Sequence, residues 1–320
     1  MNSQMIQAMT RDFLLQTVQR EIPSPQFMEI LLAKLSEEGK ALGPQPQSSW
    51  MGFTLAIGDL LDINMEQAFP MSLAVELIVL SGDVYDDMID KDNFPLQEPN
   101  LPVEKSLLFA NWTLMLAFRS VLTTRNIQSD VKQAIMTELN RAILQASWGQ
   151  WLDEDCCFPK IITEEKYLDV IRLKSGKFGE LACLAVALLA CDEQQVNLWR
   201  NAGCYLGMAE QLKNDAADFM RDSKNDLMKL KMTLPLIKSL ENSYESGDGF
   251  SELMQRVSQD QNLLWANRVQ IREYIINCGA FDYTFILSRL YTEKAFQLIE
   301  AFYGRSEKCL QLRKLFAGER

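Results

Sequence analysis

The stretch Ala74-Val-Glu-Leu-Ile-Val-Leu-Ser-Gly-Asp83-Val-Tyr-Asp86-Asp87-Met-Ile-Asp90 joins an apolar run without a polar side to four aspartates. In a helix, the 3.6-residue period gathers these aspartates on one face, within roughly 100° of arc. Like charges three and four residues apart repel each other, so we expect a positive partner there. Carboxylate oxygens are ligands that Mg²⁺ prefers. The stretch therefore predicts a buried helix that ends in a magnesium site, with a solvated acidic helix face as the alternative.

The composition excludes several classes of function. The chain has 320 residues, a formal net charge of −11 and no histidine. Serine–histidine hydrolysis and histidine-based metal catalysis are therefore excluded, and the charge speaks against a nucleic-acid partner. No apolar run reaches the roughly 18 residues of a membrane span, and the N-terminus lacks a signal-peptide core. We expect a cytoplasmic protein that is not integral to a membrane, with its seven cysteines as free thiols.

Helical periodicity runs through nearly the whole chain, while strand-like alternation is missing. The breaks between helical segments are short, and none resembles an interdomain linker. We predict one all-α domain over residues 1–304, with a short C-terminal tail at 305–320. The expected helices span residues 5–20, 25–40, 50–62, 68–92, 103–123, 128–155, 163–191, 194–222, 226–243, 250–278 and 280–302.

In a second acidic pattern, Gln211, Asp215, Asp218 and Asp222 would share one helix face, and Asn214 sits four residues before Asp218. The amide of Asn214 can offer an oxygen as a carboxylate does. Alone, this pattern would be a weak indication of a metal site. Two such faces in one helical chain favour a site between two helices. We call residues 83, 86, 87 and 90 the first motif, and residues 211, 214, 215 and 218 the second motif.

With both motifs in view, the chain resembles the trans-type polyprenyl (isoprenoid) diphosphate synthase family. Its D-D-x-x-D motif is similar to residues 86–90, and its Q-x-x-D-D-x-x-D motif to residues 211–218, with Asn214 in place of the first aspartate. Its G-Q-x-x-D, K-T-A and K-x-T-L-P elements resemble residues 149–153, 174–176 and 231–235. The resemblance implies an isoprenoid-synthase bundle of roughly 10 to 13 helices around a central cavity. It also implies about two or three Mg²⁺ ions at the two motifs.

The same resemblance implies roles for individual residues. The catalytic carboxylates would be Asp86, Asp87, Asp90, Asp215 and Asp218. The metal ligands would be these five together with Asp83 and Asn214. The diphosphate would be bound by Lys40, Lys174, Gln211 and Lys231.

The chain departs from the family where a second diphosphate would bind. The G-G-K-R-x-R-P element corresponds to residues 38–44, which keep Lys40 and lose both arginines. The arginine pair expected after the first motif falls at Pro95 and Leu96. Arginine forks bind phosphate bidentately, so their loss argues against a diphosphate-bearing acceptor.

One branch combines these features. The pattern L-I-x-L-S-x-D-x-x-D-D-x-x-D-x-D-N at residues 77–93 resembles the ComQ-type isoprenyl transferases of quorum sensing and competence. We therefore expect an Mg²⁺-dependent prenyltransferase that ionises an allylic diphosphate, geranyl or farnesyl. It would transfer the prenyl group to a tryptophan of a short precursor peptide during pheromone maturation. A homodimer is common in the family.

Several points stay open. The alternatives are a chain-elongating polyprenyl diphosphate synthase, a terpene cyclase of the same fold, and an inactive subunit with a weakened second motif. Asp83 would hold a metal-bound water, orient a lysine or form a plain salt bridge. Gln150 and Asp153 would touch metal-bound water or only link helices. The small residues Ser81 and Gly82 predict an open pocket for the prenyl tail, unless an aromatic residue such as Trp112 or Phe118 closes it.

Overall fold

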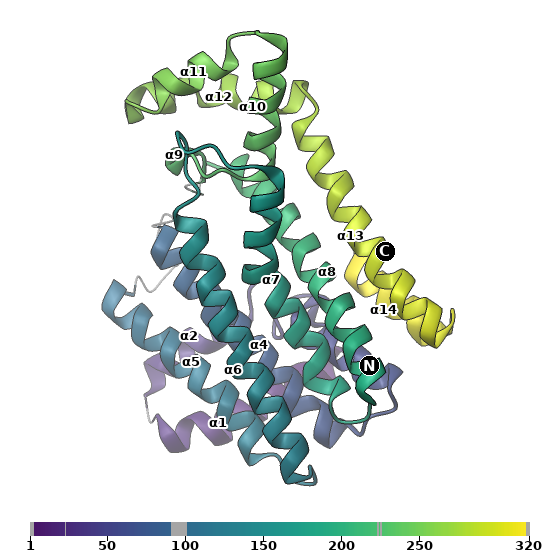
Figure 1. The fold of residues 1–320 in the computed structure, drawn as a ribbon. Coiled ribbons are helices and arrows are strands. Elements are labelled where there is room, and N and C mark those ends of the chain that lie inside the picture. Colours follow the sequence, from purple (N-terminus) through teal and green to yellow (C-terminus); the bar gives the residue numbers. More distant parts are fainter. Residues whose placement is uncertain (1–2, 23, 91–100, 223, 225, 318–320) are drawn as a thin grey trace.

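The computed structural model describes residues 3–22, 24–90, 101–222, 224 and 226–317. Over these residues the chain forms fourteen α-helices, one 3₁₀ helix and no strand, which confirms the all-α prediction (Figure 1). The helices are α1 (Ser3–Glu21), α2 (Pro25–Leu35), η1 (Pro46–Ser48), α3 (Trp50–Leu60), α4 (Met65–Asp90), α5 (Val103–Thr123), α6 (Ser129–Glu154), α7 (Glu164–Ala187), α8 (Glu193–Phe219), α9 (Asp226–Lys229), α10 (Leu234–Ser246), α11 (Phe250–Val257), α12 (Gln261–Asn277), α13 (Ala280–Tyr303) and α14 (Glu307–Ala317). The positions 95, 96 and 91–93 that the sequence singled out lie outside the described residues.

The three helices α4, α7 and α8 begin or run as their sequences dictate. At the start of α7, the Thr163 side chain accepts a hydrogen bond from the Lys166 amide. At the start of α8, Asp192 and Gln195 form a reciprocal capping box. The middle of α4 is buried on every side, as its apolar run predicted.

Two helices, α4 and α5, are long and apolar enough to cross a membrane by length and composition. In α4, 78% of the most apolar window is buried inside the bundle, against 44% in α5. Buried core helices pass the same test, so the finding is weak evidence for a membrane span. The exposed part of α5 instead leaves a row of apolar side chains at the surface.

Helices α7 and α8 pack closely along much of their length. A β-carbon on Gly179 would run into the backbone of Gly203 and Gly207, and one on Gly207 would meet the backbone of Ser175. Only glycine allows this approach of two backbones. It brings the residues after Lys174 against the helix that carries the second motif.

The structure differs from the expected helix list in the C-terminal third. The segment 226–243 divides into α9 and α10, because Leu230 takes a positive φ of 51° and Pro235 starts a new helix. The segment 250–278 divides into α11 and α12, where Asp260 caps the second helix.

The segment 305–320, predicted as a short tail, contains α14. Its Cys309 and Leu312 are fully buried in the core, because the helix presents an apolar face to α3. Helix α14 also borders a cavity of about 430 Å³ against α1 and α3. This cavity lies at the opposite end of α4 from the first motif.

Candidate active site

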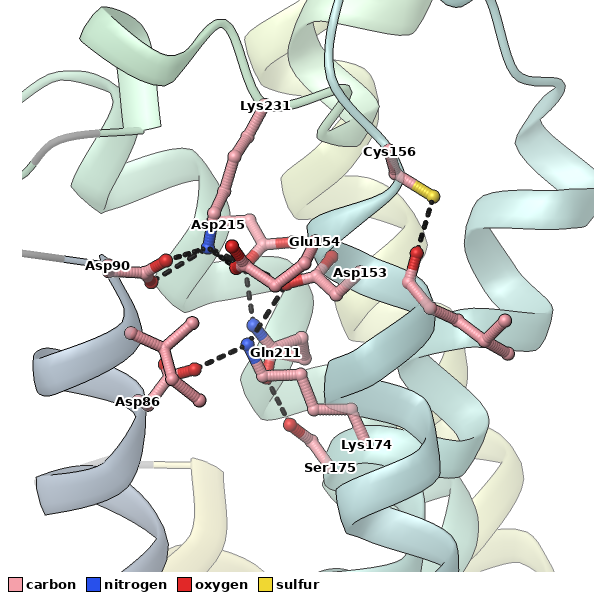
Figure 2. A network of polar contacts seen from close by, with 12 residues as sticks. Asp86, Asp90, Asp153, Glu154, Cys156, Lys174, Ser175, Gln211, Asp215 and Lys231 are labelled. Carbon is pink, nitrogen blue, oxygen red and sulfur yellow. Dashed lines mark hydrogen bonds and ion pairs between the residues drawn. The ribbon is translucent and has the colours of Figure 1, made fainter. Parts of the chain in front are cut away.

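The ammonium group of Lys174 joins three helices. Its Nζ donates to Asp86 Oδ1 on α4 at 2.9 Å and to Asp153 Oδ2 on α6 at 3.1 Å (Figure 2). Burial on its own lowers the pKa of Lys174, but Asp86 and Asp153 outweigh it and raise the pKa well above its usual value. Lys174 therefore carries a permanent positive charge between the first motif and α6. The contact shows that Asp153 links α6 to α7, while a contact with metal-bound water stays a prediction.

Lys231 reaches the same place from the opposite side. Its Nζ lies 2.7 Å from Asp90 Oδ2 and 3.6 Å from Asp153 (Figure 2). A short backbone pairing places it, since Cys157 and Lys231 form an antiparallel bridge and the Met232 amide donates to the Cys156 carbonyl at 2.8 Å. Burial works against the charge of Lys231, yet the surrounding carboxylates raise its pKa.

Asp215, in the second motif, is buried and held by two neutral donors. The Tyr167 hydroxyl donates to its Oδ2 at 2.6 Å, and Gln211 Nε2 donates to its Oδ1 at 2.5 Å. Gln211 in turn accepts a hydrogen bond from Ser175 (Figure 2). Burial and the nearby Asp153 raise the pKa of Asp215 to about 6. We call the group Asp86, Asp90, Asp153, Lys174, Asp215 and Lys231 the ionic layer.

Other predicted residues lie around this layer. Asp87 is paired with Lys224 at 3.1 Å, and Asp218 with Arg221 at 3.3 Å. Asp83 forms a salt bridge with Lys40 away from the ionic layer. Asn214 is exposed. The structure therefore brings together Asp86, Asp90, Lys174, Gln211, Asp215 and Lys231, while Lys40, Asp83, Asp87, Asn214 and Asp218 flank them.

Negative charge exceeds positive charge in the ionic layer. Asp226 stands beside it, and burial together with Asp215 and Asp90 raises the pKa of Asp226 to about 7 despite Lys231. Glu154 is nearby too, and burial raises its pKa. In the described part of the chain no three carboxylates or thiols are close enough together to hold a metal ion, since lysines stand between them. The carboxylates are nevertheless hard oxygen donors, and the lysines do not neutralise all of them, so the chemistry of this site fits Mg²⁺.

Sequence reasoning missed several contacts of this site. Tyr167 precedes Lys174 by two helical turns, so its place on the same face of α7 was readable. Lys229, which donates to Asp90 Oδ1 at 2.8 Å, and Lys224, which binds Asp87, gave no such signal. Both belong to the short segment after α8, whose path depends on tertiary contacts.

The space behind the first motif is bordered by an aromatic ring, although the small residues Ser81 and Gly82 led us to expect an open pocket there. A β-carbon on Gly82 would stand 3.2 Å from the Phe178 ring, which α7 places against α4. The Ser81 hydroxyl donates to the Ala110 carbonyl of α5 at 2.8 Å. Phe178 therefore borders this side of the first motif, and closure by Trp112 or Phe118 stays a prediction.

Comparisons with known proteins agree with this arrangement. The family described as polyprenyl synthetase matches residues 27–267. The tryptophan prenyltransferase ComQ of Bacillus subtilis (strain 168) is 27% identical over 251 residues, 77% of this chain and 79% of that protein. A geranylgeranyl diphosphate synthase of Methanosarcina mazei is 24% identical over 260 residues, 78% of each chain.

Solved structures share the fold. The geranylgeranyl pyrophosphate synthetase of the archaeon Geoglobus acetivorans superposes with a TM-score of 0.78 at 20% identity, covering 99% of both chains. The heptaprenyl diphosphate synthase of Staphylococcus aureus also gives 0.78 at 19% identity, covering 99% of this chain and 98% of that one. The match over most of the sequence and the helices that carry both motifs lead to one conclusion: this chain belongs to the polyprenyl synthetase family and is a prenyltransferase.

Proposed function

We propose that this prenyltransferase moves a geranyl or farnesyl group from its diphosphate to a tryptophan of a short precursor peptide, with Mg²⁺ as cofactor. Relatives known as tryptophan prenyltransferases support a tryptophan acceptor, since the ComQ proteins of three Bacillus strains are 22% to 27% identical to this chain. The main support comes from residues 38–44, where a second diphosphate would bind.

That place holds an internal ion pair. Lys40, the one cation kept there, forms a salt bridge with Asp83, and its side chain is only 15% exposed. Burial on its own lowers the pKa of Lys40, but Asp83 and Glu76 raise it above its usual value, so the ammonium stays charged and neutralised. Positions 41 and 43 carry no arginine. A second diphosphate would have to displace a carboxylate without arginines to replace it, which favours an uncharged acceptor.

Oxygen atoms of both motifs would hold Mg²⁺: the carboxylates of Asp86, Asp87 and Asp90 on α4 and of Asp215 and Asp218 on α8, together with the amide oxygen of Asn214. When bound, Mg²⁺ supplies positive charge that stabilises the leaving diphosphate. Lys174 and Lys231 donate hydrogen bonds to phosphate oxygens and so favour departure of that group. The apolar core below them keeps water from the allylic cation. No strong base is required, which agrees with a chain without histidine.

The test is an acceptor competition. The purified protein receives farnesyl or geranyl diphosphate and Mg²⁺, with either a tryptophan-containing peptide or labelled isopentenyl diphosphate. We expect a prenylated peptide and no elongated prenyl diphosphate. In Asp87→Ala, both the prenylated product and the release of diphosphate should be lost. A longer prenyl diphosphate as the main product would replace this proposal by chain elongation.

Chain elongation is the second candidate, because geranylgeranyl diphosphate synthases are among the relatives. A cyclase would instead release hydrocarbon from the allylic diphosphate alone. Hydrocarbon formed equally well with and without an acceptor would identify that third activity.

We also propose a homodimer. The exposed faces of two neighbouring helices carry large apolar side chains, which soluble monomers rarely leave together at the surface. They are Leu107, Leu108 and Met115 on α5, and Leu144, Trp148 and Trp151 on α6. Light scattering of the wild type should give twice the chain mass, and Trp151→Glu should reduce it to one.

A further inference from the structure

A second layer of residues lies one helical turn below the ionic layer. Its members come from the same four helices, each three or four residues from an ionic-layer residue: Gly82 on α4, Gln150 on α6, Phe178 on α7 and Gln211 on α8. Helix α7 runs antiparallel to α4, as the paired contacts Asp86–Lys174 and Gly82–Phe178 show, and antiparallel to α8, where Gly179 meets Gly203 and Ser175 meets Gly207. One turn is about 5.4 Å. The first carbons of a prenyl group would therefore enter this layer when its diphosphate is bound above.

The two amides in this layer differ in their hydrogen bonds. Gln211 is fully engaged, because it donates to Asp215 and accepts from Ser175. Both polar atoms of Gln150, Nε2 and Oε1, are buried and find no hydrogen-bond partner in the part of the chain that is described. Buried amides are nearly always paired, since leaving one unpaired costs free energy. Gln150 therefore has one donor and one acceptor group that no described protein group uses.

The position of Gln150 on α6 shows which way it faces. Ile143, two turns earlier on the same side, packs against the larger hydrophobic core of the bundle. Glu154, one turn later, lies 3.8 Å from Lys229 and 3.9 Å from Lys231, the lysines that bind Asp90 of α4. Gln150 stands between these two residues along the same side of α6. It is one turn from Asp153, which Lys174 joins to Asp86 of the first motif.

We infer that Gln150 binds the acceptor, with Oε1 accepting a hydrogen bond from the N–H of an indole ring. The inference rests on the proposed function and names the residue that recognises the acceptor. An indole nitrogen only donates, so it needs an acceptor atom without another partner, and the amide oxygen of Gln150 is one. An isopentenyl group has no such hydrogen. The bond would hold the ring in the layer where the prenyl carbon becomes reactive.

The experiment compares two acceptors that differ in that hydrogen. N-acetyltryptophanamide and its 1-methylindole analogue are each incubated with farnesyl diphosphate and Mg²⁺, and kcat/KM is measured from prenylated product by mass spectrometry. We expect methylation to lower kcat/KM of the wild type about 5- to 100-fold, the cost of leaving a buried polar group unpaired. Gln150→Leu should lose most of its activity on the unmethylated acceptor and show nearly no methylation effect. Gln150→Glu, which keeps an acceptor oxygen, should retain the effect.

The matched control is Gln145→Leu. Gln145 is another glutamine of α6 with a buried, unpaired Oε1, but it lies five residues earlier, on a different side of the helix. It should respond to methylation as the wild type does. An equal methylation effect in Gln150→Leu and wild type, or none in the wild type, overturns the inference alone. A wild type that releases diphosphate but never prenylates either compound overturns the proposed function and the inference together.

Discussion

The ammonium group of Lys231 lies 2.7 Å from Oδ2 of Asp90, although the two residues are 141 positions apart in the sequence. This contact joins the segment after α9 to the end of α4 and completes the ionic layer. Lys229 binds the other oxygen of Asp90, so two lysines hold one buried carboxylate. Burial raises the pKa of Asp90, but Lys231 and the two hydrogen bonds outweigh it, so the pKa of this group is lowered.

Replacing Lys231 tests whether this charge acts in the reaction. Lys231→Met keeps the length of the side chain and removes its charge at the leaving diphosphate. We expect kcat/KM for diphosphate release to fall about 10²- to 10³-fold, as for other losses of transition-state charge stabilisation. Urea unfolding should show a loss of about 1 to 3 kcal/mol, less than for most broken buried pairs because Lys229 still holds Asp90. Lys231→Met with unchanged turnover would contradict a phosphate-binding role.

Tyr167 positions Asp215. In Tyr167→Phe the carboxylate loses a hydrogen bond that lowers its pKa, so the pKa of Asp215 should rise further above 6. More of this group is then protonated at neutral pH, and the Mg²⁺ concentration for half-maximal diphosphate release should increase. A titration with Mg²⁺ at pH 7 and pH 8.5 measures this, and the higher pH should restore much of the loss. Tyr205→Phe, whose ring packs on Tyr291 outside the site, is the control and should leave the titration unchanged.

The Gly82–Phe178 contact predicts donor preference. Phe178→Ala removes the ring behind the first motif, so longer donors should gain in kcat/KM relative to geranyl diphosphate. Gly82→Ala places a methyl group about 3.2 Å from that ring and should disfavour the longer donor. Competition between geranyl, farnesyl and geranylgeranyl diphosphates measures the ratios. Equal ratios in both variants and wild type would show that the tail takes another path.

A pH-dependent contribution to stability comes from outside the site. Arg200 on α8 donates to both oxygens of Glu138 on α6, at 3.0 and 2.7 Å. These hydrogen bonds lower the pKa of Glu138 below its usual 4.5, despite partial burial. A carboxyl group whose pKa is lowered by folding stabilises the fold above its unfolded pKa, and this stabilisation is lost as pH falls through the folded value. Urea unfolding of wild type and Arg200→Met should therefore differ at pH 7, and the difference should shrink below pH 4.5. A difference that stays constant with pH would assign the effect to packing of the arginine stem.

Much of the fold can be predicted from the amino-acid sequence alone. The apolar run before Asp83 has no polar side, so only burial on all sides suits it, and α4 is a core helix. Thr163 and Asp192, which are residue types that commonly cap helices, directly precede α7 and α8. Helix α14 was missed because it is short. Its apolar face is stabilised by packing against α3, which the sequence pattern does not show.

The sequence by itself determined the helical class, both motifs and the absence of arginines at the second phosphate site. These are local patterns, because the period of a helix decides which side chains share a face. Only the tertiary structure decided the partners: Lys231 for Asp90, Lys40 for Asp83, Tyr167 for Asp215 and, among the described residues, none for Gln150. Such contacts join residues far apart in the chain, so no regular spacing in the sequence predicts them. They depend on how closely the helices approach, as at Gly179 and Gly203, and on where short connecting segments cross the ends of the bundle.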